Sequence, residues 1–194
     1  TYHLYPDSDA DELRDKLADN LKINRDNLLI GNGSDELIQI ITNAFTGWSD
    51  AVLCPTPSFS MYSLYTRVAG GIPAEYPLDE KFRYDFQEVE KAIAEYEPKI
   101  LHICSPNNPT GSTMPVSDIR KLAGSFDGIV VVDEAYYEFC GESAIQYIDS
   151  YPNLVILRTF SKAMGIAGLR VGYLVCNKNL AYEIHKVKPP YNVN

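Results

Sequence analysis

Hydrophobic residues fall into two patterns that alternate along the chain. In some stretches they recur every three or four positions, as Leu13, Leu17 and Leu21 do, which is typical of a helix with one buried side. Elsewhere they form short runs, which predict strands. The first pattern predicts helices over residues 11–21, 34–45, 58–68, 85–96, 116–125 and 179–186. The second predicts strands over residues 28–30, 51–54, 72–78, 99–104, 129–133, 154–158 and 170–176.

This order of elements predicts an α/β fold. Strands that alternate with helices and are hydrophobic throughout are typical of a mainly parallel sheet covered by helices on both faces. No internal repeat, low-complexity segment or linker interrupts residues 1–194, so one domain is expected. Polar residues gather just after the predicted strands, where open α/β sheets bind their ligands.

The stretch from residue 158 to 170 carries the most informative side chains. Lys162 comes shortly after two hydroxyl residues, Thr159 and Ser161, and Arg170 follows eight positions later. A lysine amine can form a Schiff base with an aldehyde, and hydroxyls with an arginine can hold a phosphate. Asp133 ends a predicted strand and could pair with a pyridinium nitrogen. Together these groups indicate pyridoxal 5'-phosphate (PLP), although Lys162 alone would be interpreted as a surface lysine.

Several short segments occur together in one order along nearly the whole chain. They are residues 5–7 (YPD), 31–36 (GNGSDE), 55–62 (PTPSFSMY), 105–111 (SPNNPTG), 133–136 (DEAY) and 158–172. In these segments the chain resembles the fold-type I PLP-dependent aminotransferases, and among them the histidinol-phosphate aminotransferases. The resemblance implies the large domain of the aspartate aminotransferase-like fold. It also implies that an N-terminal arm and a smaller C-terminal domain lie outside these 194 residues.

The resemblance assigns roles near the reacting atoms. Lys162 would carry PLP as an internal aldimine and later act as the base, and Asp133 would pair with the ring nitrogen. Tyr136 and Asn108 would donate to the phenolic oxygen of the ring. Simpler interpretations stay open: Asp133 could be a strand-end acid, and Asn108, which precedes a proline, could be a turn residue. Asn107 is expected to be a turn residue.

The resemblance also implies a phosphate site and a stacking residue. The phosphate would be held by backbone or side-chain groups of Gly33, Ser34, Asp35, Thr159, Ser161 and Arg170. Asp35 would contribute its backbone only, and Arg170 could otherwise be a surface residue. Phe59 would stack on the ring, unless it only packs in the core. Tyr5 would reach the phosphate of the other subunit in a homodimer, unless it is a loosely packed aromatic near the terminus.

The implied activity is PLP-dependent transamination of histidinol phosphate with 2-oxoglutarate, in histidine biosynthesis. A decarboxylase or lyase of the same fold, such as threonine-phosphate decarboxylase, remains an alternative. A cofactor-binding fragment without turnover is another. A nucleotide-binding domain is disfavoured because neither G-x-G-x-x-G nor G-x-x-x-x-G-K-[ST] occurs. No role is expected for Tyr62, His3, His102 or His185 beyond core or surface packing.

Composition narrows the remaining possibilities. The chain is 45% hydrophobic and 22% charged, as soluble domains are, and its net charge of −9 disfavours a nucleic-acid partner. No hydrophobic run approaches the roughly 18 residues of a membrane helix, and no leader is visible. The spacing of the four cysteines suits neither zinc nor a disulfide framework, so no metal and reduced, packed thiols are expected. A cytoplasmic location follows as an expectation.

Overall fold

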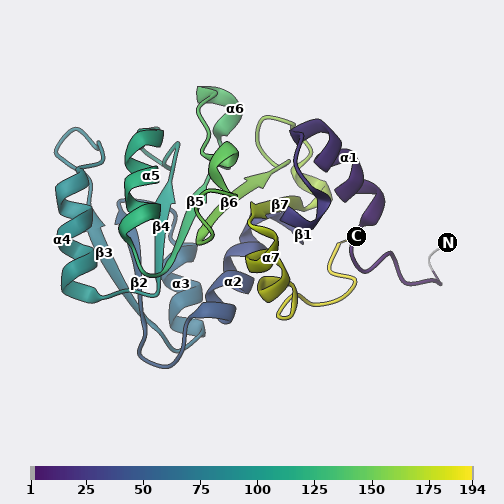
Figure 1. Cartoon of the computed structure of the whole chain (residues 1–194), viewed down its shortest axis with the longest axis horizontal. Helices are drawn as coiled ribbons and strands as arrows, with labels where there is room; N and C mark the ends of the chain where they lie inside the picture. The colour runs from purple at the N-terminus through teal and green to yellow at the C-terminus, as the bar shows by residue number, and fades with distance from the viewer. Residues whose placement is uncertain (1–2, 194) are drawn as a thin grey trace.

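Seven strands form one sheet in the order β1-β7-β6-β5-β4-β2-β3 (Figure 1). The structure is a computed structural model and describes residues 3–193. The strands are β1 (Leu28–Asn32), β2 (Ala51–Thr56), β3 (Ile72–Pro77), β4 (Ile100–Cys104), β5 (Ile129–Asp133), β6 (Leu154–Thr159) and β7 (Val171–Cys176). Only β7 runs against its neighbours, β1 and β6, and the other paired strands are parallel. The prediction of a mainly parallel sheet is confirmed.

Helices connect the strands. They are α1 (Asp11–Leu21), α2 (Gly33–Phe45), α3 (Met61–Val68), α4 (Phe86–Tyr96), α5 (Val116–Ser125), α6 (Tyr137–Cys140) and α7 (Lys178–His185). Short 3₁₀ turns lie at η1 (Arg25–Asn27), η2 (Ile145–Tyr147) and η3 (Ala167–Leu169). Sequence periodicity predicted neither these turns nor α6, because each is too short to show a hydrophobic repeat. Between residues 3 and 193, no helix has the length and hydrophobicity needed to cross a membrane.

Several boundaries differ from the sequence prediction by one to three residues, and two of these differences have a clear local reason. Helix α3 begins at Met61 rather than at residue 58, because residues 57–60 form a turn. Strand β2 continues through Pro55 to Thr56, although Pro55 was expected to end it. Strand β4 pairs with β2 only at Val52 and Leu53, so no β4 neighbour needs the N–H that Pro55 lacks.

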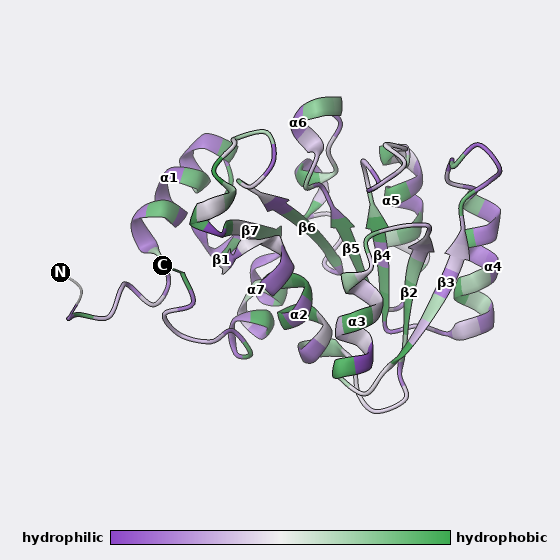
Figure 2. Cartoon of the chain, turned by 180° about the vertical axis from the view of Figure 1, so that it is seen from behind, coloured by the Kyte–Doolittle hydropathy of each residue, from purple (hydrophilic) through white to green (hydrophobic). Residues whose placement is uncertain are grey.

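The helices cover both faces of the sheet, as predicted. On one face α1, α4 and α5 pack against alternate strand residues such as Leu101, Val130 and Ile156. On the other face α2, α3 and α7 pack against the residues between them, such as Val131 and Val155. Figure 2 shows the hydrophobic residues concentrated along the central strands. Because side chains alternate along a strand, each strand contributes to both cores.

The cysteines and one histidine follow the expectation only in part. Cys54, Cys104 and Cys176 are buried free thiols, as predicted, whereas Cys140 is exposed. Cys140 ends the short helix α6 outside both cores, and this explains the difference. His102 lies fully buried on β4, so its expected packing role agrees with its position.

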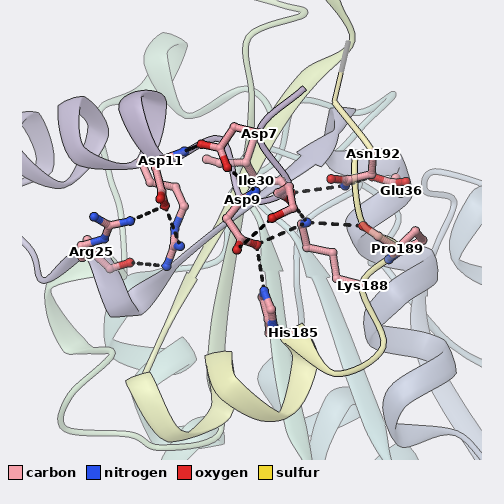
Figure 3. A network of polar contacts seen from close by, with 12 residues as sticks. Asp7, Asp9, Asp11, Arg25, Ile30, Glu36, His185, Lys188, Pro189 and Asn192 are labelled. Atoms are coloured by element: carbon pink, nitrogen blue, oxygen red, sulfur yellow. Dashed lines mark hydrogen bonds and ion pairs between the residues drawn. The ribbon is translucent and has the colours of Figure 1, made fainter. Parts of the chain in front are cut away.

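The two ends of the described chain are joined to each other by polar contacts (Figure 3). His185 Nε2 lies 2.9 Å from Asp9 Oδ1, and Lys188 Nζ donates to the carbonyl oxygen of Ser8 at 2.7 Å. Farther along, Asn192 Nδ2 donates to Glu36 Oε2 at 2.6 Å in the first turn of α2. The segment after α7 is therefore fixed against the residues that precede α1 and against α2.

Candidate functional site

A buried carboxylate lies at the end of the central strand β5. Asp133 is 4% exposed, and it accepts from the Tyr62 hydroxyl at 2.8 Å and from the Ala135 N–H at 3.0 Å. Burial raises the pKa of Asp133, while those two hydrogen bonds and the charge of Lys162 oppose the rise. Within residues 3–193, no basic side chain lies at ion-pair distance from Asp133. A buried carboxylate without a cation suits a protonated ring nitrogen of a ligand.

Lys162 and Tyr136 lie near this acid. Lys162 is exposed on the loop after β6, and its Nζ lies 5.3 Å from the centre of the Tyr136 ring. Its charge lowers the pKa of Asp133, as expected for an amine facing that carboxylate. The structure therefore brings together the three residues expected to be catalytic, two from the end of β5 and one from the loop after β6.

The first residues of α2 (Gly33, Ser34 and Asp35) and the side chain of Arg170 form a site suited to an anion, which we call the anion cradle. Gly33 has a φ of +78°, and a Cβ there would lie 2.7 Å from Arg170 Nη2. A Cβ at Gly172 would lie 2.3 Å from the backbone nitrogen of Ser34. Glycine at both positions thus allows Arg170 and β7 to approach the helix N-terminus closely. Free N–H groups beside a guanidinium are suited to bind a phosphate.

Two further predicted phosphate residues lie around the cradle. Arg170 Nη1 donates to Ser161 Oγ at 3.4 Å, so these side chains meet. Thr159 is buried, and its Oγ1 accepts from the Ser161 N–H at 3.2 Å. The Thr159 hydroxyl therefore stabilises the turn that carries Ser161.

The Asp35 carboxylate is held by a side chain of α3. Its Oδ2 accepts from the Tyr65 hydroxyl at 2.9 Å. The carboxylate is therefore engaged with α3, while the backbone N–H of Asp35 remains in the first turn of α2. This arrangement agrees with the expectation that Asp35 contributes only its backbone.

Phe59 and Asn108, the remaining residues expected to contact the ring, lie next to Tyr62 and Tyr136 respectively. Phe59 is half-buried and meets Tyr62 edge-on, with ring centres 5.6 Å apart. Asn108 and Tyr136 line one cavity of ≈ 350 Å³. Asn107, expected to be a turn residue, is buried and donates to the Pro57 carbonyl oxygen at 2.9 Å. It joins the 105–112 loop to the segment that precedes α3.

Tyr5 lies apart from the other predicted site residues. It is 82% exposed, and its ring stacks on Tyr191 with centres 4.7 Å apart and planes 23° apart. The resemblance implies that this hydroxyl lies at the site of another subunit. A single chain cannot test a contact between subunits, so this role of Tyr5 stays a prediction.

Sequence reasoning missed two tyrosines at this site. Tyr62 was expected only to pack in the core; it is fully buried, but its hydroxyl donates to Asp133. Tyr65, one turn later on α3, donates to Asp35. The spacing of Tyr62 and Tyr65 at an interval of three was the available signal, because such positions share one side of a helix.

A buried ion pair behind Asp133 was missed as well. Arg158 donates through Nε and Nη2 to Glu134 Oε2 at 3.0 and 2.9 Å, and both side chains are at most 5% exposed. Ser143 donates to the same carboxylate, and the Arg158 guanidinium lies 3.7 Å from the centre of the Tyr137 ring. The pair joins the ends of β5 and β6, and it directly adjoins Asp133 and Thr159 in sequence.

The fold and the site together define a class of protein. An acid ends a central strand, an exposed lysine lies beside it, and an anion cradle opens a helix at the same end of the sheet. Such a domain is suited to a ligand that combines a protonated ring nitrogen, an aldehyde and a phosphate. Residues 1–194 match the model of the family described as aminotransferase class I and II, and the chain belongs to this family.

Individual relatives agree with this assignment. The chain is 45% identical over 192 residues to the histidinol-phosphate aminotransferase of Caldanaerobacter subterraneus subsp. tengcongensis, covering 99% of this chain and 55% of that protein. The crystal structure of histidinol-phosphate aminotransferase from Sinorhizobium meliloti in complex with pyridoxal-5'-phosphate has a TM-score of 0.91 at 26% identity. That match covers 98% of this chain and 53% of the other.

A relative with another activity is also similar in structure. The L-threonine-O-3-phosphate decarboxylase of Porphyromonas gingivalis has a TM-score of 0.83 at 31% identity, covering 99% of this chain and 60% of that chain. The chain spans about half the length of the curated relatives that it matches.

Proposed function

We propose that this chain is the cofactor-binding part of a PLP-dependent aminotransferase that acts on histidinol phosphate, with 2-oxoglutarate as amino acceptor. The observation that carries the proposal is the buried carboxylate of Asp133, which has no ion-pair partner within residues 3–193, together with nearby Lys162 and the cradle at Gly33 and Arg170. The identity to histidinol-phosphate aminotransferases over nearly the whole chain supports the substrate. In this role the protein would serve histidine biosynthesis in the cytoplasm, where fractionation of cells should find it.

When bound, PLP supplies an electron-withdrawing ring that makes the Cα proton of an attached amino acid removable. Lys162 Nζ would hold the cofactor's aldehyde carbon and, once released, would move the proton from the substrate Cα. Asp133 would hold a proton at the ring nitrogen. Tyr136 and Asn108 would orient the ring through its phenolic oxygen, and Phe59 would stack on its face.

The cradle would bind the phosphate group. Gly33, Ser34 and Asp35 would offer backbone N–H groups at the N-terminus of α2, and Arg170 would offer its guanidinium. Ser161 would add a hydroxyl, while Thr159 would stabilise the turn that carries Ser161 by accepting a hydrogen bond from the Ser161 N–H. Binding at these points would restrict where the aldehyde can lie and so favour its approach to Lys162, because the aldehyde and the phosphate arm are attached to neighbouring atoms of one rigid ring.

The proposal includes a homodimer in which Tyr5 reaches the phosphate bound by the other subunit. Its exposure in the single chain supports a partner outside this chain. Mixing a Tyr5→Phe chain with a Lys162→Ala chain should give heterodimers in which one site is wild type at both positions. A mixed dimer in which PLP titration finds no site of wild-type affinity would exclude the cross-subunit role.

The test of reaction type uses the half-reaction in the full protein that carries this sequence. Histidinol phosphate alone should convert bound PLP to its amine form and release one equivalent of the ketone in which a carbonyl oxygen replaces the amino group of the substrate, without carbon dioxide. Adding 2-oxoglutarate should restore the aldehyde form. An inert cofactor in the presence of histidinol phosphate would refute the proposed substrate.

A second candidate is the decarboxylation of threonine O-phosphate, favoured by the similarity to the Porphyromonas gingivalis enzyme. The two activities differ in what leaves the substrate Cα, a proton or carbon dioxide. Release of carbon dioxide from threonine O-phosphate, with bound PLP still in its aldehyde form after turnover, would favour this candidate over transamination.

A further inference from the structure

Helix α3 carries two tyrosines that each hold a carboxylate of the site. The Tyr62 hydroxyl donates to Asp133 Oδ2 at 2.8 Å, and the Tyr65 hydroxyl donates to Asp35 Oδ2 at 2.9 Å. The acids come from different elements, the end of β5 and the first turn of α2. The tyrosines are three residues apart, so they lie on one side of α3. One helix therefore contacts the ring end and the phosphate end of the site.

The Tyr62 hydroxyl has little freedom to turn away from Asp133. Its fully buried ring stacks on His102 with centres 4.5 Å apart, and Phe59 packs edge-on against it. Burial lowers the pKa of His102 to about 3, so this stacking partner is neutral. Burial also raises the pKa of Tyr62, which keeps its hydroxyl protonated and able to donate.

Other groups that face Asp133 differ from Tyr62 in what they provide. The titratable groups that interact with this carboxylate lie on several elements: Tyr62, Asp35, Lys162, Cys104 and Tyr84. Of these, Tyr62 is the side chain that donates a hydrogen bond to Asp133. Asp35 has the opposite effect, because its charge raises the pKa of Asp133.

Asp35 lies where its carboxylate could compete with a phosphate. An acidic side chain in the first turn of a helix can accept from the free N–H groups there, and these are the groups that a phosphate would use. Tyr65 instead holds Oδ2, while Oδ1 is buried and has no hydrogen-bond partner among residues 3–193. Burial raises the pKa of Tyr65 to about 12, so this donor stays protonated.

We propose that Tyr62 and Tyr65 are positioning residues: Tyr62 holds the Asp133 carboxylate toward the ring nitrogen, and Tyr65 holds the Asp35 carboxylate away from the phosphate cradle. This inference rests on the proposed function, since it assumes a ligand with both a ring nitrogen and a phosphate. It assigns the two ends of the site to two separable contacts on α3. Removing each hydroxyl alone should therefore change a different property.

The Tyr62 contact can be tested without cofactor. The ¹³Cγ resonance of Asp133, identified by its loss in Asp133→Asn, is titrated in the cofactor-free full protein. In Tyr62→Phe the pKa of Asp133 should rise by about one to two units, because a carboxylate loses one hydrogen bond from a buried donor. Tyr76→Phe is the matched control, since Tyr76 is equally buried but donates to the His102 carbonyl oxygen at 2.8 Å. Equal pKa values in the two variants would overturn this half of the inference.

The Tyr65 contact is tested by comparing the affinities for PLP and for pyridoxal, which lacks the phosphate. In Tyr65→Phe the preference for PLP should fall about tenfold, because Asp35 is free to compete for the cradle. In an Asp35→Asn background the same substitution should have no such effect. An unchanged preference in Tyr65→Phe would overturn this half. A wild-type protein that shows no preference for PLP would instead refute the proposed function, while the Asp133 titration would still decide the role of Tyr62.

Discussion

The strand ends and the loop after β6 supply two kinds of residue to the same site. At the strand ends Asp133, Glu134 and Arg158 are buried, and each makes several hydrogen bonds within the protein. On the loop Lys162 and Arg170 are exposed, and Arg170 makes one long contact with Ser161. Buried charges must be satisfied for the domain to fold, whereas exposed ones remain available to a ligand. The fold therefore fixes the position of Asp133, whereas the positions of Lys162 and Arg170 become fixed only when they contact a ligand.

Replacing the buried acid should have the largest effect on reaction rate. Asp133→Asn should leave PLP bound but slow the half-reaction with histidinol phosphate by about 10²–10³-fold or more, because the ring nitrogen loses its ionic partner. Single-turnover kinetics measure this rate. Asp127→Asn, at an exposed acid, is the control. Near wild-type rates in Asp133→Asn would contradict the assigned role.

The buried ion pair should dominate stability. Glu134→Ala leaves Arg158 buried without its carboxylate and should cost about 3–5 kcal/mol of unfolding free energy. Urea denaturation of the full protein measures this cost. Lys121→Ala breaks the exposed pair with Asp118 and should cost less than about 1 kcal/mol. If the urea denaturation curves of the two variants had similar midpoints and slopes, the buried pair of Glu134 and Arg158 would not be what stabilises the strand ends.

Removing the exposed arginine should affect the ligand and leave the fold intact. Arg170→Ala should weaken PLP affinity by about one to two decades, because the phosphate loses a charged donor, and should leave urea stability unchanged. Equilibrium titration measures the affinity, and pyridoxal affinity should stay near the wild-type value. Arg67→Ala is the control at another exposed arginine. A loss of pyridoxal affinity as large as that of PLP would place Arg170 elsewhere than at the phosphate.

The contact between the chain ends should have the smallest effect. A hydrogen bond with His185 lowers the pKa of Asp9, so Asp9 stabilises the fold above its ordinary pKa and this stability is lost as the pH falls through the lowered value. Asp9→Asn should cost less than about 1 kcal/mol near neutral pH, and the difference from wild type should vanish in strong acid. Thermal unfolding at both pH values checks this. A constant difference, or an equal one in Asp149→Asn, would contradict it.

The sequence predicted most of the helices and strands and most of the residues that lie together at the candidate site. It did not predict the contacts that hold those residues in place. Helices α1 and α5 and strand β5 have the predicted bounds, because their hydrophobic patterns are regular. The contact of Tyr62 with Asp133 joins residues 71 positions apart, and that of Arg158 with Glu134 joins residues 24 apart. Periodicity describes one element at a time, so it cannot predict which polar side chains from different elements meet.

The most direct test of the proposed function is the location of the covalent bond to PLP. The full protein is incubated with PLP, reduced with borohydride, digested and analysed by peptide mass spectrometry. The adduct should lie on Lys162 and should disappear in Lys162→Ala, while Lys178→Ala, at another exposed lysine, should retain it. An adduct that stays at its original position in Lys162→Ala, or one found mainly on another lysine, would contradict the assignment of Lys162.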